Sequence, residues 1–283
     1  MSPFSRPKAK KTEIETSPFF QRDSTLEAKL AEALGETLRG EVQAFTQVPS
    51  TMDLAHQLAA EGKREGTLVF ALGQTQGRGR LGRVWESPSG GAYFSLIVRP
   101  DRPAADIPQL ALIAGLAAVE AIRECAMLSP RVRWPNDVLI GTKKVAGILT
   151  EAKNGAVVIG IGINVGTKLS DLLETATSLA EAGGKHLDPF HLTGRLYRRF
   201  YRWYDVWTGQ GFSLIRDALR PHMALFGEVV RISTDQQQAT GDKQQANDLE
   251  GQAMDIDEQG RLLVRLDSGI VKAFEMGEVK LLR

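Results

Sequence analysis

The chain has 283 residues, 42% of them hydrophobic, so it can bury the core of one large domain or of two smaller ones. Its 35 Lys and Arg residues balance 34 Asp and Glu residues, which argues against a protein that mainly coats nucleic acid through phosphate neutralisation. The single cysteine, Cys125, excludes an intrachain disulfide, and the four histidines lack metal-type spacing. No stretch approaches about 20 apolar residues and no secretory signal follows the basic start, so we predict a cytoplasmic protein without a membrane span.

The N-terminal quarter is predicted to hold a flexible tail, two helices and a strand. The tail covers residues 1–23. Leucines at every fourth position predict a helix that starts at Ser24-Thr25 and ends at Gly40. A strand follows over residues 41–48, and Pro49-Ser50-Thr51 starts a second helix that ends at Gly62.

The middle of the chain mixes strand and helix patterns, which is typical of an α+β fold. Strands are predicted over residues 67–72, 92–98, 131–134 and 156–165, with a hairpin pairing 138–140 and 145–151. Helices are predicted over residues 106–125, 188–207 and 213–225.

From Gly227 onward, short strands over residues 229–232, 262–266 and 271–274 alternate with turns, and residues 236–248 read as a polar loop. We therefore predict three parts: a tail with a short helix (1–40), an α+β domain (41–226) and a small all-β module (227–283).

The segment from Gln74 to Trp85, QTQGRGRLGRVW, alternates glycine with arginine between two predicted strands. Glycines let the backbone approach a ligand, and arginines bind phosphate or carboxylate with two parallel hydrogen bonds. An RNA-binding Arg/Gly segment would be repeated and disordered, and a solvated turn would not need this composition. The loop is not a Walker A motif, so the pattern favours an anion-binding loop of another kind.

The predicted strand at residues 156–165, AVVIGIGINV, has two different faces. Odd positions from Val157 to Val165 form an apolar stripe, whereas the other face carries Gly160, Gly162 and Asn164. Two glycines on one face indicate that something lies close to it, either a packed helix or a flat ligand whose edge bonds to Asn164.

Three further features are weak when taken singly. Ser50-Thr51 is an ordinary helix cap, or a helix N-terminus that binds a carbonyl or carboxylate. In Arg133-Trp134-Pro135-Asn136-Asp137, the Asn suits an adenine edge and the Asp suits Mg²⁺ or a neighbouring base. Lys144 begins an apolar strand, where partial desolvation would strengthen it as an electrostatic partner.

Taken together and in this order, these motifs resemble the biotin–protein ligase family. The resemblance rests on the Ser-Thr helix start, the Gly/Arg loop with SPSGG after it, WPND, KKVAGIL and GIGIN, and covers residues 48–165. The C-terminal module is similar to the SH3-like β-barrel that ends these enzymes. The resemblance implies a mixed-sheet catalytic domain of the biotin–lipoate ligase, class II synthetase-like type, and a two-step reaction. Biotin and ATP first give biotinyl-5′-AMP, and a lysine of a biotin carboxyl carrier protein then accepts the biotin.

The resemblance also implies roles for individual residues. Lys144 and Arg80 would be catalytic. Biotin would contact residues of the helix start, the Gly/Arg loop and two strands: Ser50, Thr51, Met52, Gln74, Gly77, Arg78, Gly79, Arg80, Lys144, Gly147, Gly160 and Gly162. The nucleotide would contact Arg78, Arg80, Arg83, Trp85, Arg133, Asn136, Asp137 and Asn164. Mg²⁺ would be held through the phosphates, with Asp137 as the candidate protein ligand.

Two positions depart from the family pattern: Met52 stands where many members have Asn, and Arg133 where Lys is usual. The segment before the first strand is too short for the winged-helix repressor domain of some members, so we predict a monofunctional ligase without specific DNA binding. A homodimer is expected by family analogy alone. A lipoate or octanoate transferase shares the fold but lacks the Gly/Arg loop, and a non-catalytic sensor or repressor is disfavoured by Lys144 and that loop.

Overall fold

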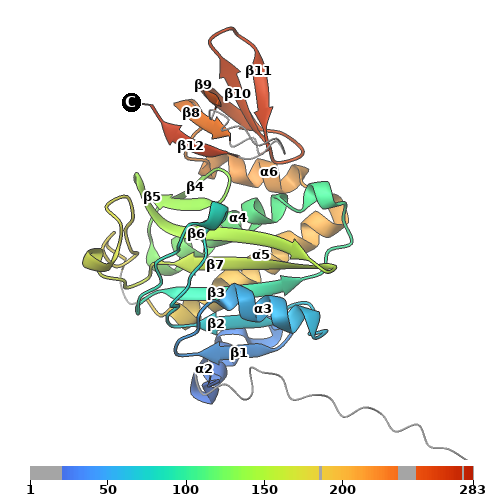
Figure 1. Cartoon of the computed structure of the whole chain (residues 1–283), viewed down its shortest axis with the longest axis vertical. Helices are drawn as coiled ribbons and strands as arrows, with labels where there is room; N and C mark the ends of the chain where they lie inside the picture. Colours follow the sequence, from blue (N-terminus) through green and yellow to red (C-terminus); the bar gives the residue numbers. More distant parts are fainter. Residues whose placement is uncertain (1–20, 185–186, 235–246, 276, 283) are drawn as a thin grey trace, which may run out of the picture.

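The computed structural model describes residues 21–184, 187–234, 247–275 and 277–282, which form two β-sheets with helices (Figure 1). The larger sheet has seven strands in the order β1-β2-β3-β7-β6-β5-β4, and only its β1–β2 pair is parallel. Its strands are β1 (Val42–Phe45), β2 (Leu68–Ala71), β3 (Ala92–Val98), β4 (Pro130–Arg133), β5 (Asp137–Ile140), β6 (Lys143–Lys153) and β7 (Ala156–Ile163).

The helices cover the two faces of the large sheet unequally. Figure 1 shows α3 in front of the sheet and α4 and α5 behind it. The described helices are α2 (Ser24–Leu34), α3 (Thr51–Ala60), α4 (Gln109–Ala126), α5 (Pro189–Gln210) and α6 (Ser213–Leu219). This arrangement confirms the α+β class predicted from the sequence.

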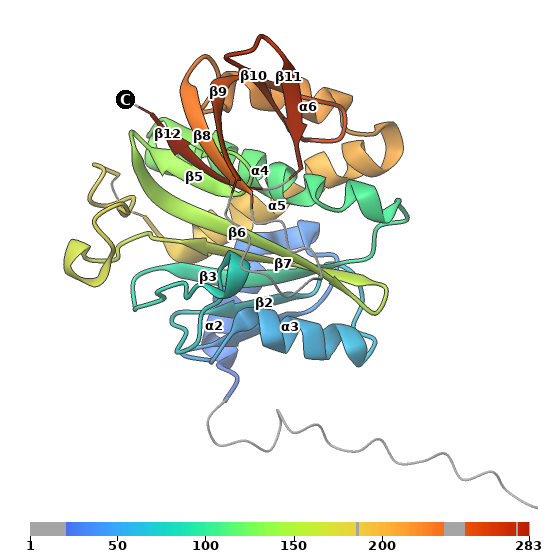
Figure 2. The same cartoon turned by 45° about the horizontal axis from the view of Figure 1, so that its top comes forward.

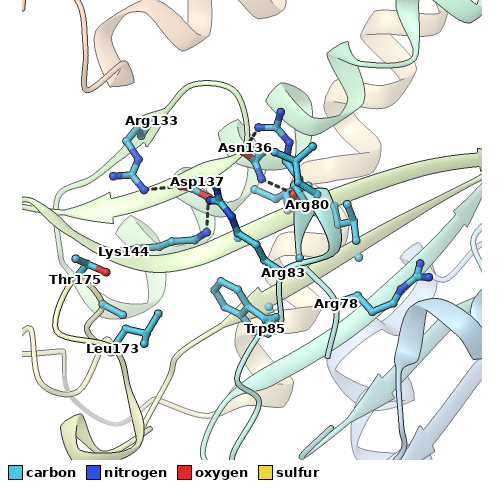
Figure 3. A pocket seen from close by; sticks show the side chains of 18 of the residues that line it. Arg78, Arg80, Arg83, Trp85, Arg133, Asn136, Asp137, Lys144, Leu173 and Thr175 are labelled. Carbon is cyan, nitrogen blue, oxygen red and sulfur yellow. Dashed lines mark hydrogen bonds and ion pairs between the residues drawn. The ribbon is translucent and has the colours of Figure 1, made fainter. Parts of the chain in front are cut away.

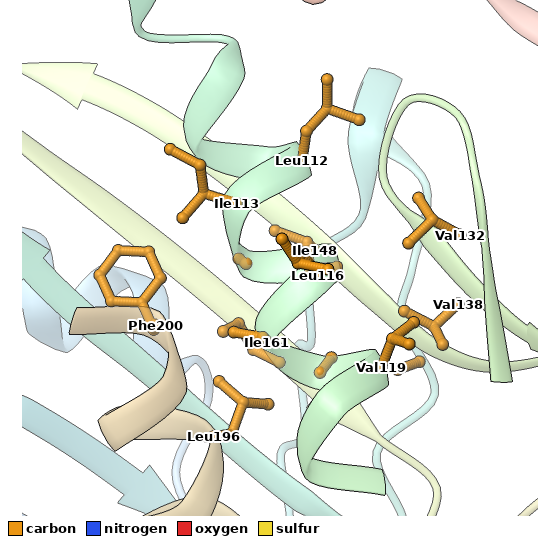
Figure 4. Close-up of a cluster of buried hydrophobic side chains, with 14 of the residues drawn as sticks. Leu112, Ile113, Leu116, Val119, Val132, Val138, Ile148, Ile161, Leu196 and Phe200 are labelled. Atoms are coloured by element: carbon orange, nitrogen blue, oxygen red, sulfur yellow. The ribbon is translucent and has the colours of Figure 1, made fainter. Parts of the chain in front are cut away.

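The apolar stripe of β7 faces the main core, as its sequence predicted. Ile161 packs with Leu116 of α4 and with Leu196 and Phe200 of α5, all of them buried (Figure 4). Each such side chain stabilises the fold by roughly 1.5–3 kcal/mol through burial. The opposite face of β7, with Gly160 and Gly162, turns toward α3 and the Gly/Arg loop. The core therefore fixes which face of the sheet remains available for a site.

Helix α4 corrects one expectation from the sequence. The helical stretch Ala104–Ala126 is long and apolar enough to cross a membrane, although no such stretch was predicted. It is 67% buried inside the fold, where it packs against α5 and the large sheet. Its apolar composition is explained by this central position. Cys125, near its C-terminal end, is half-buried, and burial raises the pKa of its thiol, which disfavours a reactive thiolate.

The predicted helices exist but two boundaries were wrong. Helix α2 is capped by Asp23, whose carboxylate accepts hydrogen bonds from the backbone amides of Thr25 and Leu26. The helix ends at Gly35 rather than at Gly40. Gly35 has φ +55°, a conformation that favours glycine. Helix α6 ends at Leu219 instead of Leu225, because Pro221 cannot continue the helical hydrogen bonds.

The smaller sheet is antiparallel, with five strands in the order β11-β10-β9-β8-β12, and lies beside α6 (Figure 2). Its strands are β8 (Val229–Thr234), β9 (Asn247–Ile256), β10 (Leu262–Leu266), β11 (Val271–Phe274) and β12 (Glu278–Leu281). Strands β9 and β12 were not predicted. The predicted N-terminal tail and most of the predicted 236–248 loop lie outside the described residues. The division into domains at residues 41–226 and 227–283 stays a prediction.

Candidate functional site

A pocket of about 690 Å³ opens between the glycine face of the large sheet, the Gly/Arg loop and the C-terminal strand (Figure 3). A pocket of this size suits a ligand as large as a small cofactor. Every residue assigned from the family resemblance lines it except Ser50 and Gly77, which lie directly behind its wall. The structure thus brings together residues that are up to about 110 positions apart in the sequence.

The N-terminus of α3 forms one end of the pocket. Ser50 caps the helix, its hydroxyl accepting the amide of Asp53 at 3.4 Å, and is itself buried. Gln74 Oε1 accepts the amide of Thr51 at 2.8 Å, and Gln74 Nε2 donates to Ser87 Oγ at 2.8 Å. Thr51 Oγ1 also lies 2.8 Å from Ser95 Oγ. This network orients hydroxyl and amide groups at the closed end of the pocket.

The glycines of the sheet are required because side chains lie directly on them. A Cβ on Gly160 would lie 2.5 Å from Met52 Sδ, and one on Gly162 would lie 2.4 Å from Trp85 Nε1. Gly147 on β6 also meets the Trp85 ring, at 2.8 Å from a built Cβ. At Gly160 the close neighbour is Met52 of helix α3, which packs on this face, and at Gly147 and Gly162 it is Trp85 of the Gly/Arg loop. The indole N–H of Trp85 is buried and has no hydrogen-bond acceptor among the described residues.

The Gly/Arg loop folds as a small hairpin, defined here as Gly77–Trp85. Trp85 N donates to Gly77 O at 2.9 Å, and Gly79 N donates to Arg83 O at 2.7 Å. A Cβ on Gly77 would lie 2.2 Å from Trp85 O, so only glycine allows the two arms to approach. Gln74, Trp85 and the hairpin are thereby held as one unit over the pocket.

The three arginines of the hairpin point in three directions. Arg80 donates to Asn136 Oδ1 at 3.0 Å, while Arg83 donates to Glu278 of β12 at 2.6 Å. Arg78 turns away from Lys144 and binds Glu151 (Figure 3). Burial lowers the pKa of Arg80, because desolvation disfavours its charged form. Arg80 is therefore a partly desolvated cation among the residues that line the pocket.

The turn between β4 and β5 carries the charged centre of the pocket. Lys144 Nζ lies 2.5 Å from Asp137 Oδ1, and Arg133 donates to Asp137 Oδ2 at 2.6 Å. The Lys144 ammonium also lies 4.9 Å from the centre of the Trp85 ring, within cation–π range. Asn136 Nδ2 donates to Ile148 O at 2.9 Å, which fixes its carbonyl oxygen toward Arg80. Lys144, Arg133 and Arg80 thus bring three cations to this end, against the carboxylates of Asp137 and Glu278.

Asn164, at the end of β7, lies on the same face as the two glycines. Its Nδ2 donates to Thr177 O at 3.0 Å, whereas its buried Oδ1 has no partner within the described part of the chain. A buried acceptor without a partner is costly, which makes this atom a candidate ligand contact.

Two parts of the pocket were not predicted from the sequence. One part is Leu172, Leu173, Thr175 and Ala176, which are held at the pocket because Lys144 N donates to Thr175 O at 2.9 Å and Thr177 N donates to Lys144 O at 2.8 Å. Residues 277–281 line it from the smaller sheet. The signals available in the sequence were the adjacent leucines Leu172-Leu173 and the Gly277-Glu278-Val279 segment near the C-terminus, and neither was assigned to the site.

The pocket therefore has a polar closed end at α3, an apolar middle over the glycines and a cationic end at Lys144. This order of polar, apolar and cationic surfaces suits an apolar carboxylic acid whose carboxylate meets a phosphate beneath a covering loop. Fold and site together define a ligase that activates a carboxylic acid with a nucleotide.

Comparisons with known proteins agree with this class. The model described as Biotin/lipoate A/B protein ligase family matches residues 44–167, and Biotin protein ligase C terminal domain matches residues 243–282. The chain is 38% identical over 235 residues to the bifunctional ligase/repressor BirA of Bacillus subtilis (strain 168), covering 80% of this chain and 69% of the relative. It is 32% identical over 222 residues to a biotin–[acetyl-CoA-carboxylase] ligase of Paracoccus denitrificans, covering 74% of this chain and 88% of the relative.

The fold resembles the biotin protein ligase from Aquifex aeolicus in complex with biotin and ATP, with a TM-score of 0.74 and 30% sequence identity. That match covers 86% of this chain and 98% of the other. The chain belongs to the biotin protein ligase branch of the biotin/lipoate protein ligase family.

Proposed function

We propose that the chain activates biotin with ATP and transfers it to the ε-amine of a lysine in a biotin carboxyl carrier protein. In the first step a biotin carboxylate oxygen attacks the α-phosphorus of ATP, giving biotinyl-5′-AMP and releasing pyrophosphate. In the second, the lysine amine attacks the acyl carbon and AMP leaves. The observation that carries the proposal is the position of Lys144, whose Nζ lies 2.5 Å from Asp137 Oδ1 at one end of the pocket that the sheet glycines line.

Lys144 and Arg80 supply the electrostatics of the first step. Two anions, the carboxylate and the α-phosphate, must approach each other, and preorganised cations offset their repulsion and stabilise the charge that develops. Lys144 is about three-quarters buried and oriented by Asp137, so its ammonium has little freedom to lose on binding. Arg80 approaches the same end through its contact with Asn136.

The two ends of the pocket support separate binding roles. The Thr51, Gln74 and Ser95 network offers hydrogen-bonding groups to the polar ring of biotin, and Met52 replaces a polar partner with a thioether over Gly160. Asn136, Asn164 and four residues of the segment after β7 (Leu172, Leu173, Thr175 and Ala176) line the same pocket as Lys144, which supports a role for them in binding the nucleotide. Arg133 keeps the positive charge of the lysine that is usual in the family, and it forms an ion pair with Asp137.

Mg²⁺ would enter with the triphosphate. Asp137 already places one oxygen on Lys144 and the other on Arg133, and no group of three His, Cys, Asp or Glu side chains in the described ranges could hold a metal ion. Mg²⁺ commonly takes only one or two carboxylates and uses phosphate oxygens for the rest. Asp137 is therefore the candidate protein ligand of a metal held mainly by ATP.

The hairpin Gly77–Trp85 would act as the cover of the site. A mixed anhydride hydrolyses easily, so a loop that excludes water protects it until the acceptor lysine arrives. Monofunctional activity without specific DNA binding, a cytoplasmic location and a homodimer stay predictions from the sequence and the family resemblance.

The test is an assay with the purified chain, ATP, Mg²⁺ and a carrier domain. We expect pyrophosphate release that requires biotin, ATP and Mg²⁺ together, and a mass increase of one biotin on one carrier lysine. Replacing biotin with lipoate is the matched control, because the family includes lipoate ligases. Release with lipoate but not biotin would overturn the proposal.

A further inference from the structure

A charged cluster lies beyond the α3 end of the pocket. Glu151 Oε2 on β6 accepts a hydrogen bond from Arg78 of the hairpin and lies 2.9 Å from His56 Nε2 of α3. Arg78 Nη1 also lies 3.3 Å from Asp53 Oδ1. Glu151, His56 and Asp53 do not line the pocket, although Arg78 does, so the proposed reaction gives no role to these three residues around Arg78.

Glu151 nevertheless belongs to the face of the sheet that carries the pocket. Side chains alternate along a strand, so Gly147, Leu149 and Glu151 share one face of β6. Gly147 and Leu149 line the pocket, and Glu151 follows them where the pocket ends. Glu151 is thus the next residue on this face of β6 beyond those that line the pocket.

The contact with Arg78 reaches Trp85 through the backbone. Arg78 pairs with Val84 across the hairpin, and Trp85 N donates to Gly77 O at 2.9 Å. Anchoring one arm therefore anchors the other, and the second arm carries the indole that covers Gly147 and Gly162.

We propose that Glu151 is a positioning residue that holds the hairpin closed by binding Arg78. The proposal rests on the proposed function, because it is the adenylate that the closed hairpin retains. Glu151 is the main anchor rather than Asp53, since its side chain is less exposed, at 36% against 54%, and its contact with Arg78 is shorter. His56, with 15% of its side chain exposed, holds the carboxylate in place from α3.

How much the ion pair between Arg78 and Glu151 stabilises the closed hairpin depends on this preorganisation. An isolated exposed ion pair contributes little, because two long side chains must be ordered to form it. Here the carboxylate is already fixed by His56, so closing the hairpin orders only Arg78. Arg78 is also held away from Lys144, which leaves Arg80 as the hairpin arginine that faces the reacting groups.

The experiment compares wild type with Glu151→Gln, which keeps the shape of the side chain and removes its charge. Two quantities are measured: the rate at which biotinyl-5′-AMP escapes into solution, and the rate of tryptic cleavage after Arg78, Arg80 or Arg83 in the free protein. We expect both to rise about three- to tenfold, the scale of losing one charge-assisted contact, while the single-turnover adenylation rate stays within about twofold.

The matched control is Glu250→Gln, which removes a carboxylate paired with Arg231 on the smaller sheet and away from the pocket. A double variant, Glu151→Gln with Arg78→Gln, should release adenylate no faster than Arg78→Gln alone. If Glu151→Gln behaves like Glu250→Gln in both measurements, or adds to Arg78→Gln, the proposal is overturned. Tryptic cleavage needs no substrate, so it tests the anchor even if the chain activates a different acid.

Discussion

The indole N–H of Trp134 donates a buried 3.0 Å hydrogen bond to the carbonyl oxygen of Gly260. The bond joins the turn that carries Asn136 and Asp137 to the turn between β9 and β10 of the smaller sheet. A second, partly buried hydrogen bond lies beside it, in which Gln109 Nε2 donates to Glu258 O at 3.1 Å. The smaller sheet is therefore fixed to the part of the catalytic domain that holds the charged centre of the pocket.

Replacing Trp134 with Phe tests this attachment. The change keeps an aromatic ring and leaves the Gly260 carbonyl without its buried donor, so we expect the free energy of unfolding to fall by about 1–3 kcal/mol. Urea denaturation measures the change. Trp203→Phe is the control, because the Trp203 N–H has no hydrogen-bond partner among the described residues. Equal losses in the two variants would contradict a specific role for the Trp134 bond.

Lys144 is expected to be the side chain whose loss slows adenylation most. Lys144→Ala removes a preorganised cation from the end of the pocket, and we expect the adenylation rate to fall about 10²- to 10³-fold. Pyrophosphate release in a single turnover measures it. Lys143→Ala is a matched control, because this neighbouring lysine is exposed and does not line the pocket. An unchanged rate in Lys144→Ala would remove Lys144 from the reacting centre.

Patterns that are local in the sequence predicted much of this site. The two faces of β7, the cap at Ser50 and the position of α3 follow from side-chain periodicity and capping chemistry, which act over a few residues. The alternation of glycine and arginine in the Gly/Arg loop predicted an anion-binding site, because few other functions need this composition. Family resemblance then joined these fragments into one pocket, which periodicity alone could not do.

What the sequence did not predict depends on distant contacts. The glycine face was expected to meet a ligand or a helix. Its neighbours are Met52 of helix α3 and Trp85 of the hairpin, so the helix was one of the two alternatives and the indole was not foreseen. The pocket wall at residues 277–281 depends on the docking of the smaller sheet through Trp134 and Gln109. Neither relation leaves a spacing pattern, because the partners are about 60 to 150 residues apart.

Arg80 is expected to matter more for retaining the adenylate than for folding. Arg80→Gly removes the contact with Asn136 and a partly buried cation, and it touches no core side chain. We expect faster escape of biotinyl-5′-AMP with a change in the free energy of unfolding below about 1 kcal/mol, as for other changes outside the core. Chromatographic quantification of free adenylate, alongside urea denaturation, separates the two effects. Adenylate release equal to that of wild type would count against closure of the hairpin over the product.

The contact between Arg83 and Glu278 gives a pH prediction. The hydrogen bond from Arg83 lowers the pKa of Glu278 below its usual value of 4.5. A carboxyl whose pKa is lower in the folded state stabilises the fold above its unfolded pKa, and this contribution is lost as the pH falls through the lowered value. The difference in melting temperature between wild type and Glu278→Gln should therefore stay constant from about pH 8 to 6 and shrink below about pH 4.5. Glu275→Gln, an exposed carboxylate in the same module, controls for the general loss of negative charge. A difference that persists unchanged into strong acid would show that Glu278 acts through packing instead of through its charge on Arg83.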